Sequence, residues 1–362
     1  MRVFLIGYPG EMGGANTEAW HTIQLWKRAG LDVHLISTWG GDAGWREKLD
    51  ALGFVTHQVP PGELERVPGL AGSPVVGFCN SEFITHAPRF RALGCPIVWV
   101  NCMTFLFDYE KQFFDLHGPA DAMVYQSEFQ RSQLEPQLFP SGPTPANGHL
   151  IRGAFDLGCW EFKPRPHAAG EPFCVGRLAR PDLDKWSSNI WKIYERIPYQ
   201  NRRALVMGVD PGTSEKLGPA PAWASVLRPA AIPASQFFAN LHCLLPVNGG
   251  ARENWPRAGL EAMAAGVPIV AQNEWGWREM IEHGVTGFLG SCDEELAHYA
   301  ARLAYDEELR LRIAHAARER LTEELANSEA LTAAWTRLFA SVTGDAAAAP
   351  DSTSTAALPA SV

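Results

Sequence analysis

A short apolar run, then a polar or glycine-rich loop, then a helical segment is a pattern that recurs along most of the chain. The first unit has an apolar run at residues 2–7, a helix pattern at 16–29 and a second apolar run at 33–37. Runs that are apolar almost throughout are typical of parallel strands covered by helices on both faces. The pattern therefore predicts α/β architecture with doubly wound parallel sheets, which bind ligands at the carboxyl ends of their strands.

The alternation breaks once, in the Pro-, Gly- and charge-rich stretch 162–171, and restarts with an apolar run at 173–178. A chain of 362 residues is long enough for two domains with full cores. We predict domains at 1–165 and 166–326, an amphipathic helix within 327–344, and a disordered low-complexity tail at 345–362. Two such domains create a cleft, which is the default place for a ligand.

Composition excludes several classes of protein. A net charge of −9 disfavours a nucleic-acid binder, because such proteins carry a basic stripe. No run approaches the roughly 18 apolar residues of a membrane span, and the N-terminus lacks a signal-peptide pattern. We therefore expect a cytoplasmic protein with seven reduced, scattered cysteines that are mostly small core residues. No spacing of cysteine or histidine indicates a metal site.

The stretch 241–271 is the most informative part of the second domain. Its apolar runs 241–247 and 267–271 predict buried strands, with a helix between them that ends at Gly266. Asn254 is a plausible N-cap for this helix, and Pro256 suits its first turn. A helix N-terminus offers free N–H groups and a positive dipole end, so this one suits a phosphate.

Two acids, Glu253 and Glu261, lie eight residues apart around this helix start. Their carboxylates can accept hydrogen bonds from sugar hydroxyls, which suggests a nucleotide-sugar site. The alternative is that both are ordinary acids complementing the helix dipole.

Two cations, Arg177 and Lys185, follow the first strand of the second domain. An Arg fork and a compact Lys charge suit a diphosphate. The alternative is a solvated loop whose cations pair with Asp182 and Asp184. Asp182-Leu183-Asp184 also resembles a paired-acid motif that holds a divalent metal on a nucleotide sugar, but no apolar run directly precedes it.

The first domain has a glycine-rich loop ending in Gly13-Gly14, directly after its first predicted strand. The spacing is not that of a dinucleotide-binding fingerprint, which argues against a nicotinamide cofactor. Several tryptophans stand in or beside predicted cleft loops, where they can stack on sugar rings or simply pack; they are Trp39, Trp45, Trp255, Trp275 and Trp277.

In this order, these features resemble the retaining glycosyltransferases of family 4, which have the GT-B fold. The matching segments are Gly13-Gly14, Gly176-Arg177-Leu178 with Lys185, the pair Glu253 and Glu261 with the run 261–271, and Glu279 with 284–289. Segments 120–134 and 149–164 also resemble family patterns, so the likeness covers about residues 1–345.

The resemblance implies roles for individual residues. Arg177 and Lys185 would hold the donor diphosphate, Glu253 the donor sugar, and Glu261 the nucleotide ribose. Gly13 and Gly14 would let the backbone approach the phosphates and the acceptor. The final helix would return onto the first domain.

The chain also departs from the family. Where many members carry a histidine after a first-domain strand, this chain has Asn101 or Asn80, and an amide cannot act as a general base. The glycines that usually follow the first Glu are replaced by Asn254 and Pro256, which leaves fewer backbone N–H groups for phosphate. We count Asn101, Asn254 and Trp255 among the expected substrate-binding residues.

The expected activity is retaining, metal-independent transfer from a nucleoside-diphosphate sugar to a glycan, glycolipid or small acceptor, as in bacterial-type polysaccharide or glycoconjugate biosynthesis. No cofactor besides the donor is expected, and any membrane association would be peripheral. A nucleotide-sugar epimerase on the same fold and a non-catalytic nucleotide- or glycan-binding protein remain as alternatives.

Overall fold

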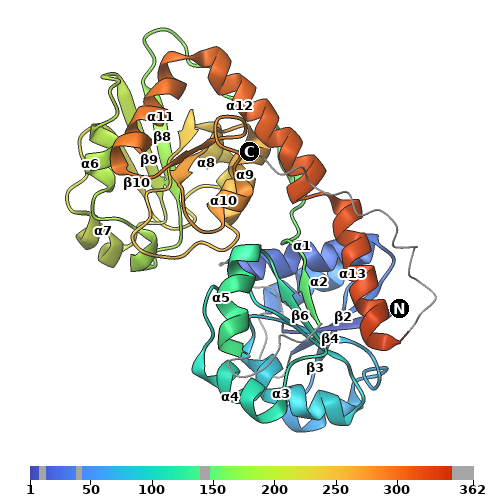
Figure 1. Cartoon of the computed structure of the whole chain (residues 1–362). Helices are drawn as coiled ribbons and strands as arrows, with labels where there is room; N and C mark the ends of the chain where they lie inside the picture. Colours follow the sequence, from blue (N-terminus) through green and yellow to red (C-terminus); the bar gives the residue numbers. More distant parts are fainter. Residues whose placement is uncertain (8–13, 38–42, 139–146, 345–362) are drawn as a thin grey trace, which may run out of the picture.

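The computed structural model describes residues 1–7, 14–37, 43–138 and 147–344. Gly13, Trp39 and the tail at 345–362 lie outside the described residues. Within them the chain forms two α/β domains, each built on a parallel sheet (Figure 1). The predicted fold class is confirmed.

The N-terminal sheet has seven parallel strands in the order β3-β2-β1-β4-β5-β6-β7. Its strands are β1 (Arg2–Ile6), β2 (Asp32–Ser37), β3 (Val55–Gln58), β4 (Val75–Phe78), β5 (Ile97–Val100), β6 (Ala122–Tyr125) and β7 (Gly148–Leu150). Its helices are α1 (Gly14–Arg28), α2 (Ala43–Ala51), α3 (Ser81–Ala92), α4 (Asp108–His117) and α5 (Glu128–Leu138). β1, β4, β5 and β6 are buried on both faces, as their apolar runs predict.

The C-terminal sheet has the order β10-β9-β8-β11, and a bridge between Leu244 and Ile269 links it to the pair β12-β13. Its strands are β8 (Phe173–Leu178), β9 (Arg202–Met207), β10 (Ala224–Leu227), β11 (Cys243–Leu244), β12 (Val270–Gln272) and β13 (Phe288–Gly290). Its helices are α6 (Ile190–Glu195), α7 (Pro211–Leu217), α8 (Ala234–Ala239), α9 (Arg257–Ala265), α10 (Trp277–Met280), α11 (Asp293–Tyr305) and α12 (Glu307–Arg320), and α13 (Ser328–Thr343) follows.

Around α9 the structure corrects two local predictions. The run 241–247 is buried, yet only Cys243–Leu244 pairs as a strand, because Val247 N–H donates back to the Leu245 carbonyl and not to a neighbouring strand. Asn254 is not the N-cap: α9 begins at Arg257 with Pro256 in the cap position. The predicted end is confirmed, since Gly266 has the left-handed φ of 86° that glycine tolerates best.

The cysteines divide into buried, half-buried and exposed groups, and Cys79 and Cys102 are half-buried. Cys95, Cys174 and Cys243 are buried, as predicted, and burial raises the pKa of all three thiols. The expectation of core positions is wrong for Cys159 and Cys292, which are exposed. All seven are free of disulfide bonds.

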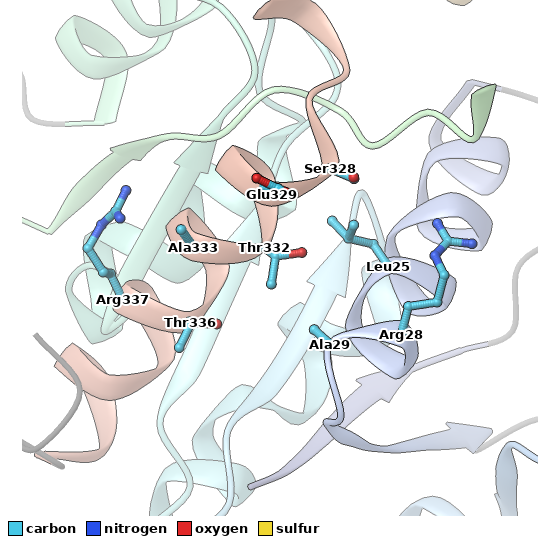
Figure 2. Close-up of a pocket in the computed structure, with 9 residues that line it drawn as sticks. All are labelled: Leu25, Arg28, Ala29, Ser328, Glu329, Thr332, Ala333, Thr336 and Arg337. Carbon is cyan, nitrogen blue, oxygen red and sulfur yellow. The ribbon is translucent and has the colours of Figure 1, made fainter. Parts of the chain in front are cut away.

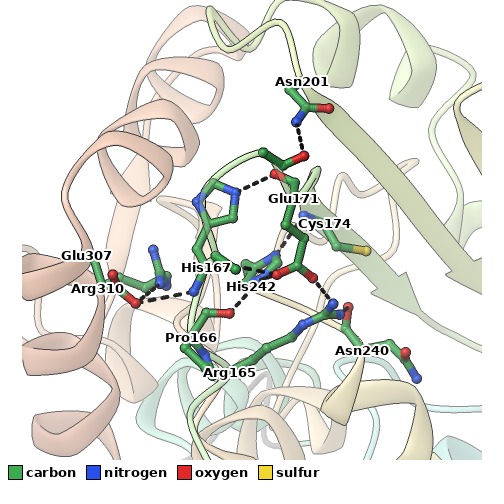
Figure 3. A network of polar contacts seen from close by, with 12 residues as sticks. Arg165, Pro166, His167, Glu171, Cys174, Asn201, Asn240, His242, Glu307 and Arg310 are labelled. Carbon is green, nitrogen blue, oxygen red and sulfur yellow. Dashed lines mark hydrogen bonds and ion pairs between the residues drawn. The ribbon is translucent and has the colours of Figure 1, made fainter.

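The segment entering the second domain is fastened to that domain's sheet (Figure 3). His242, before β11, accepts a hydrogen bond at Nδ1 from Cys174 N–H at 2.9 Å, so its Nε2–H donates to the Pro166 carbonyl 3.2 Å away. Arg165 donates to the Asn240 carbonyl at 2.6 Å and pairs with Glu171. Burial lowers the pKa of His242 to about 4, so this imidazole is neutral near pH 7.

Helix α13 packs on the N-terminal domain, beside α1, although α12 before it belongs to the C-terminal domain (Figure 1). Trp335 meets Trp26 of α1 edge-on, with ring centroids 4.9 Å apart, and Leu338 and Phe339 join the same core. The outer sides of α1 and α13 leave a groove of about 530 Å³ (Figure 2). The chain therefore crosses between the domains twice.

Replacing the buried anchor of α13 should weaken the attachment of this helix. We expect Trp335→Ala to lower the free energy of unfolding by about 3–5 kcal/mol, as for other buried aromatic truncations. Denaturant unfolding followed by circular dichroism measures the change. Arg337→Ala, at an exposed position on the same helix, is the control. Equal stability of the two variants would contradict the packing described.

Candidate functional site

Two predicted site residues, Lys185 and Glu253, meet at the carboxyl end of the C-terminal sheet. Lys185 ends the 3-10 turn Leu183–Lys185, and its Nζ lies 2.8 Å from Oε2 of Glu253. Their side chains are only 22% and 17% exposed. Lys185 does not pair with Asp182 of its own loop, because Asp182 pairs with Arg180 at 3.1 Å. A cation and a carboxylate 68 residues apart in sequence therefore share one partly desolvated position.

The turn that carries Lys185 is held by backbone contacts. The Asp184 carbonyl accepts hydrogen bonds from Gly249 N–H at 3.1 Å and Ala251 N–H at 3.0 Å. A side chain at Gly249 would overlap the Trp186 carbonyl, so this close approach requires glycine. Of the two acids of the paired-acid motif, Asp182 directly precedes this turn and Asp184 lies within it. Among the described residues, no cluster of three or more His, Cys, Asp or Glu could hold a metal.

Arg177 lies beneath this turn. The residue is 2% exposed, its Nη2 donates to the Lys185 carbonyl, and its guanidinium lies 5.2 Å from the Trp186 ring centroid. Burial lowers its pKa, while nearby Glu253 opposes that change. Its Nε is buried without a hydrogen-bond partner among the described residues. Arg177 therefore supports the Lys185 backbone and adds positive charge beside Glu253.

The start of α9 faces the N-terminal domain through Arg257, a residue not predicted for the site. Arg257 Nη1 donates to the Ala154 carbonyl at 2.7 Å, and its guanidinium lies 5.2 Å from the Phe155 ring. A Cβ added to Gly14 would lie 3.8 Å from Arg257 Cγ. The start of α1 and the start of α9 are therefore neighbours across the domain boundary.

Arg257 also faces two carboxyl groups, Glu18 of α1 and Glu261 of α9. Burial raises the pKa of each to about 7, and the Arg257 charge opposes the rise in both cases. The Gln126 side chain also hydrogen-bonds Glu18 and opposes it further. The Arg257 guanidinium thus favours the ionised form of two desolvated carboxyl groups. In the sequence, the signal for Glu18 is an acid on the mostly apolar, buried face of α1.

Asn254 and Trp255 are both buried at the domain boundary. Asn254 directs its amide to the N-terminal domain, where it hydrogen-bonds Ser127, Gln126 and Cys102. The Trp255 ring has the Arg152 guanidinium 4.6 Å from its centroid. Both side chains therefore contact the N-terminal domain.

Asn101 and Asn80 differ in how their amides are used. Asn80 accepts from Glu82 N–H at 2.8 Å as the N-cap of α3, and donates to the Ile6 carbonyl at 2.9 Å. Asn101 Oδ1 accepts from Met103 N–H at 2.6 Å, whereas its Nδ2 is buried without a partner in the described part of the chain. The Nδ2 group of Asn101, just after β5, is therefore a hydrogen-bond donor with no acceptor among the described residues.

The other tryptophans expected near a cleft lie in different surroundings. Trp277 is 3% exposed in the core of the C-terminal domain. Trp45 meets Trp20 with ring centroids 5.4 Å apart. Trp275 has a left-handed φ of 49°, in the tight turn before α10.

Both the sequence and the structure of this chain are similar to those of known proteins. Residues 237–320 match the family model described as Glycosyl transferases group 1, a segment that includes Glu253, Arg257 and Glu261. Anabaena HepE in complex with UDP-glucose has a TM-score of 0.71 at 17% identity, covering 95% of this chain and 100% of that one. Sucrose-phosphate synthase from Thermosynechococcus elongatus gives 0.70 at 16% identity, with 95% and 100% coverage.

A third similar structure is a mutant of TarM from S. aureus in complex with fondaparinux, α-GlcNAc-glycerol and UDP. Its TM-score is 0.69 at 10% identity, covering 93% of this chain and 99% of that one. At these identities the structural likeness establishes the GT-B fold. The family match adds that residues 237–320, within the C-terminal domain, are similar to the group 1 glycosyl transferases.

The raised pKa of buried Glu18 predicts a pH-dependent stability. A carboxyl whose folded-state pKa is raised from 4.5 to about 7 stabilises the fold least above pH 7, where it must ionise in a desolvated position. Glu18→Gln should therefore gain up to about 3 kcal/mol of unfolding free energy relative to wild type between pH 4.5 and 8. Denaturant unfolding across that range measures it. A difference between the two proteins that does not change with pH would contradict the burial.

Proposed function

We propose that this protein transfers a sugar from a nucleoside-diphosphate donor to an acceptor hydroxyl, with retention of configuration and without a metal ion. The observation that carries the proposal is the Lys185–Glu253 pair beside Arg177 and the start of α9. A diphosphate would bind Lys185 in competition with Glu253 and release that carboxylate toward the donor sugar. Glu261, on the next turns of α9, would accept hydrogen bonds from the ribose.

The proposed step breaks the bond between the sugar C1 and the diphosphate oxygen and forms one from C1 to the acceptor oxygen. The acceptor proton passes to the departing phosphate oxygen on the same face of the sugar. Lys185 and the α9 N-terminus would stabilise the charge that builds on the diphosphate. The spare Nδ2 of Asn101 would donate to a donor or acceptor hydroxyl, because an amide can orient a sugar without exchanging a proton.

On the acceptor side, we infer a platform of aromatic rings in the segment after β5. Phe105, Phe107 and Tyr109 are 44%, 41% and 38% exposed, and the rings of Phe107 and Tyr109 stack at 5.3 Å. The same segment reaches the C-terminal domain, since Thr104 Oγ1 lies 3.5 Å from the Arg252 carbonyl, next to Glu253. Exposed rings here favour a glycan acceptor whose sugar faces stack on them.

Removing the Lys185–Glu253 pair should abolish transfer. We expect Lys185→Ala and Glu253→Gln each to lower kcat/KM at least about 100-fold, because each loses transition-state charge stabilisation or donor positioning. Turnover with a panel of UDP-, GDP-, ADP- and TDP-sugars measures it. Lys192→Ala, an exposed lysine on α6, is the matched control. Full activity of either site variant would refute the proposal.

The acceptor platform makes a separate prediction. Phe107→Ala should raise the acceptor KM about 3- to 10-fold and leave the donor KM unchanged, since one stacked ring contributes about 0.5–1.5 kcal/mol. Steady-state kinetics with each substrate varied in turn separates the two constants. Leu116→Ala, an exposed apolar residue on α4, is the control. An unchanged acceptor KM in Phe107→Ala would exclude the platform.

Two alternatives are separated by simple assays. An epimerase would alter the donor sugar with no acceptor present, and a binding protein would recognise donor without turnover. An epimerase would leave the exposed aromatic rings unused, whereas a glycan-binding protein would use them, so the turnover assay separates transfer from binding.

We place the reaction in the biosynthesis of a polysaccharide or glycoconjugate, on the cytoplasmic side of a membrane, with any membrane contact peripheral. None of the described helices is long and apolar enough to cross a bilayer. No cofactor besides the donor enters the proposal.

A further inference from the structure

The side chain of Asn254 joins the C-terminal domain to the N-terminal domain. Its Nδ2 donates to Gln126 Oε1 at 2.8 Å and to the Cys102 carbonyl at 3.3 Å. Its Oδ1 accepts from Ser127 Oγ at 2.6 Å. Because Asn254 is only 5% exposed, these bonds are shielded from water, and breaking them leaves buried polar groups unpaired.

The partners on the N-terminal domain determine the orientation of this amide. Ser127 Oγ accepts from Gln130 N–H at 3.0 Å, in the first turn of α5, so its own hydrogen is available to Asn254 Oδ1. With Oδ1 bound there, both hydrogens of Nδ2 point to the two remaining acceptors. The side chain is therefore matched to its site in shape and in hydrogen-bond polarity.

A second residue of the C-terminal domain meets the same end of α5. Glu279 of α10 accepts from Glu128 N–H at 3.1 Å and Phe129 N–H at 2.8 Å, which caps a helix of the opposite domain. A carboxylate at a helix N-terminus is favoured by the free N–H groups and the dipole. Arg152 lies 3.9 Å from the same carboxylate. Asn254, in the loop before α9, and Glu279, in α10, are here called the α5 clasp, because both bind the same end of α5.

The α5 clasp is connected to Glu253 through the backbone. Gly276 N–H donates to the Glu253 carbonyl at 2.9 Å, and a side chain at Gly276 would overlap the Asn254 carbonyl. The backbone at Glu253 and Asn254 is therefore in direct contact with the turn that leads into α10 and Glu279. Any opening at the end of α5 would carry Glu253 away from the N-terminal domain.

We propose that Asn254 is a positioning residue that ties domain closure to the placement of Glu253, assisted by Glu279. For the role of Glu253 this rests on the proposed function. A glycine at 254, the residue of the family pattern that this chain resembles, could make none of the three side-chain hydrogen bonds.

The test compares Asn254→Gly and Asn254→Asp with wild type in the full-length protein. The aspartate keeps the shape but turns a carboxylate oxygen toward the acceptors of Gln126 and Cys102, so both variants should release the clasp. Small-angle scattering without ligand should show a larger radius of gyration for both. The kcat of transfer should fall about tenfold or more, since small misplacements of reacting groups cost that much.

Three further measurements make the test specific. Binding of UDP, GDP, ADP and TDP alone, by thermal shift, should be unchanged in both variants, because Asn254 does not touch the diphosphate site in this proposal. Ser127→Ala combined with Asn254→Gly should lower kcat no further than Asn254→Gly alone, as expected for residues in contact. Asn240→Ala, an exposed amide within the C-terminal domain, should match wild type throughout.

Unchanged scattering and kcat in both Asn254 variants would overturn the proposal. So would a loss of nucleoside-diphosphate binding that parallels the loss of kcat, because Asn254 would then be a donor ligand. If wild type transfers no sugar, the proposed function fails. Ligand-free scattering then still decides whether Asn254 holds the domains together.

Discussion

Two parallel sheets that point the carboxyl ends of their strands at each other create the constraint on which this structure depends. The loops that follow β5 and β6, together with the start of α1, meet the loop that follows β11 and the start of α9. These loops carry polar backbone ends, because strand and helix termini leave N–H and C=O groups unpaired. Because the loops of the two domains lie against each other, these backbone groups need hydrogen-bond partners from the opposite domain. Side chains such as Asn254, Glu279 and Arg257 supply hydrogen bonds across the boundary.

Desolvation then sets the electrostatics of the boundary. Lys185 and Glu253 compensate each other's charge, while Arg257 lies between Glu18 and Glu261, whose pKa values rise to about 7. A bound diphosphate would add negative charge to a region that already holds buried carboxyls, so the cations there have competing partners. This competition gives a physical basis for linking donor binding to rearrangement: an anion that recruits Lys185 frees Glu253.

The connections between the domains are distributed over the molecule. The segment at 165–171 is fastened to the C-terminal domain by Arg165 and His242, and α13 is fastened to the N-terminal domain by Trp335. The α5 clasp lies at the boundary between them. Anchored crossings with a polar, breakable contact between the domains suit a protein whose cleft must open to admit and release a substrate.

Much of this protein was determined by its sequence alone. Apolar runs of strand length alternating with helices predicted the parallel α/β fold, because burial on both faces demands such runs. Arg177 and Lys185 could be singled out at the carboxyl end of a predicted strand, and Glu253 and Glu261 around a predicted helix start. What the local pattern could not show is where polar side chains point. Asn254 has the sequence signature of an N-cap, yet its amide leaves its own helix for Ser127 of the other domain. Lys185 pairs with Glu253 and not with the acids beside it. Glu18 and Arg257 meet only because α1 and α9 face each other. These choices depend on contacts between residues distant in the chain, and only the tertiary structure brings those residues within hydrogen-bonding distance.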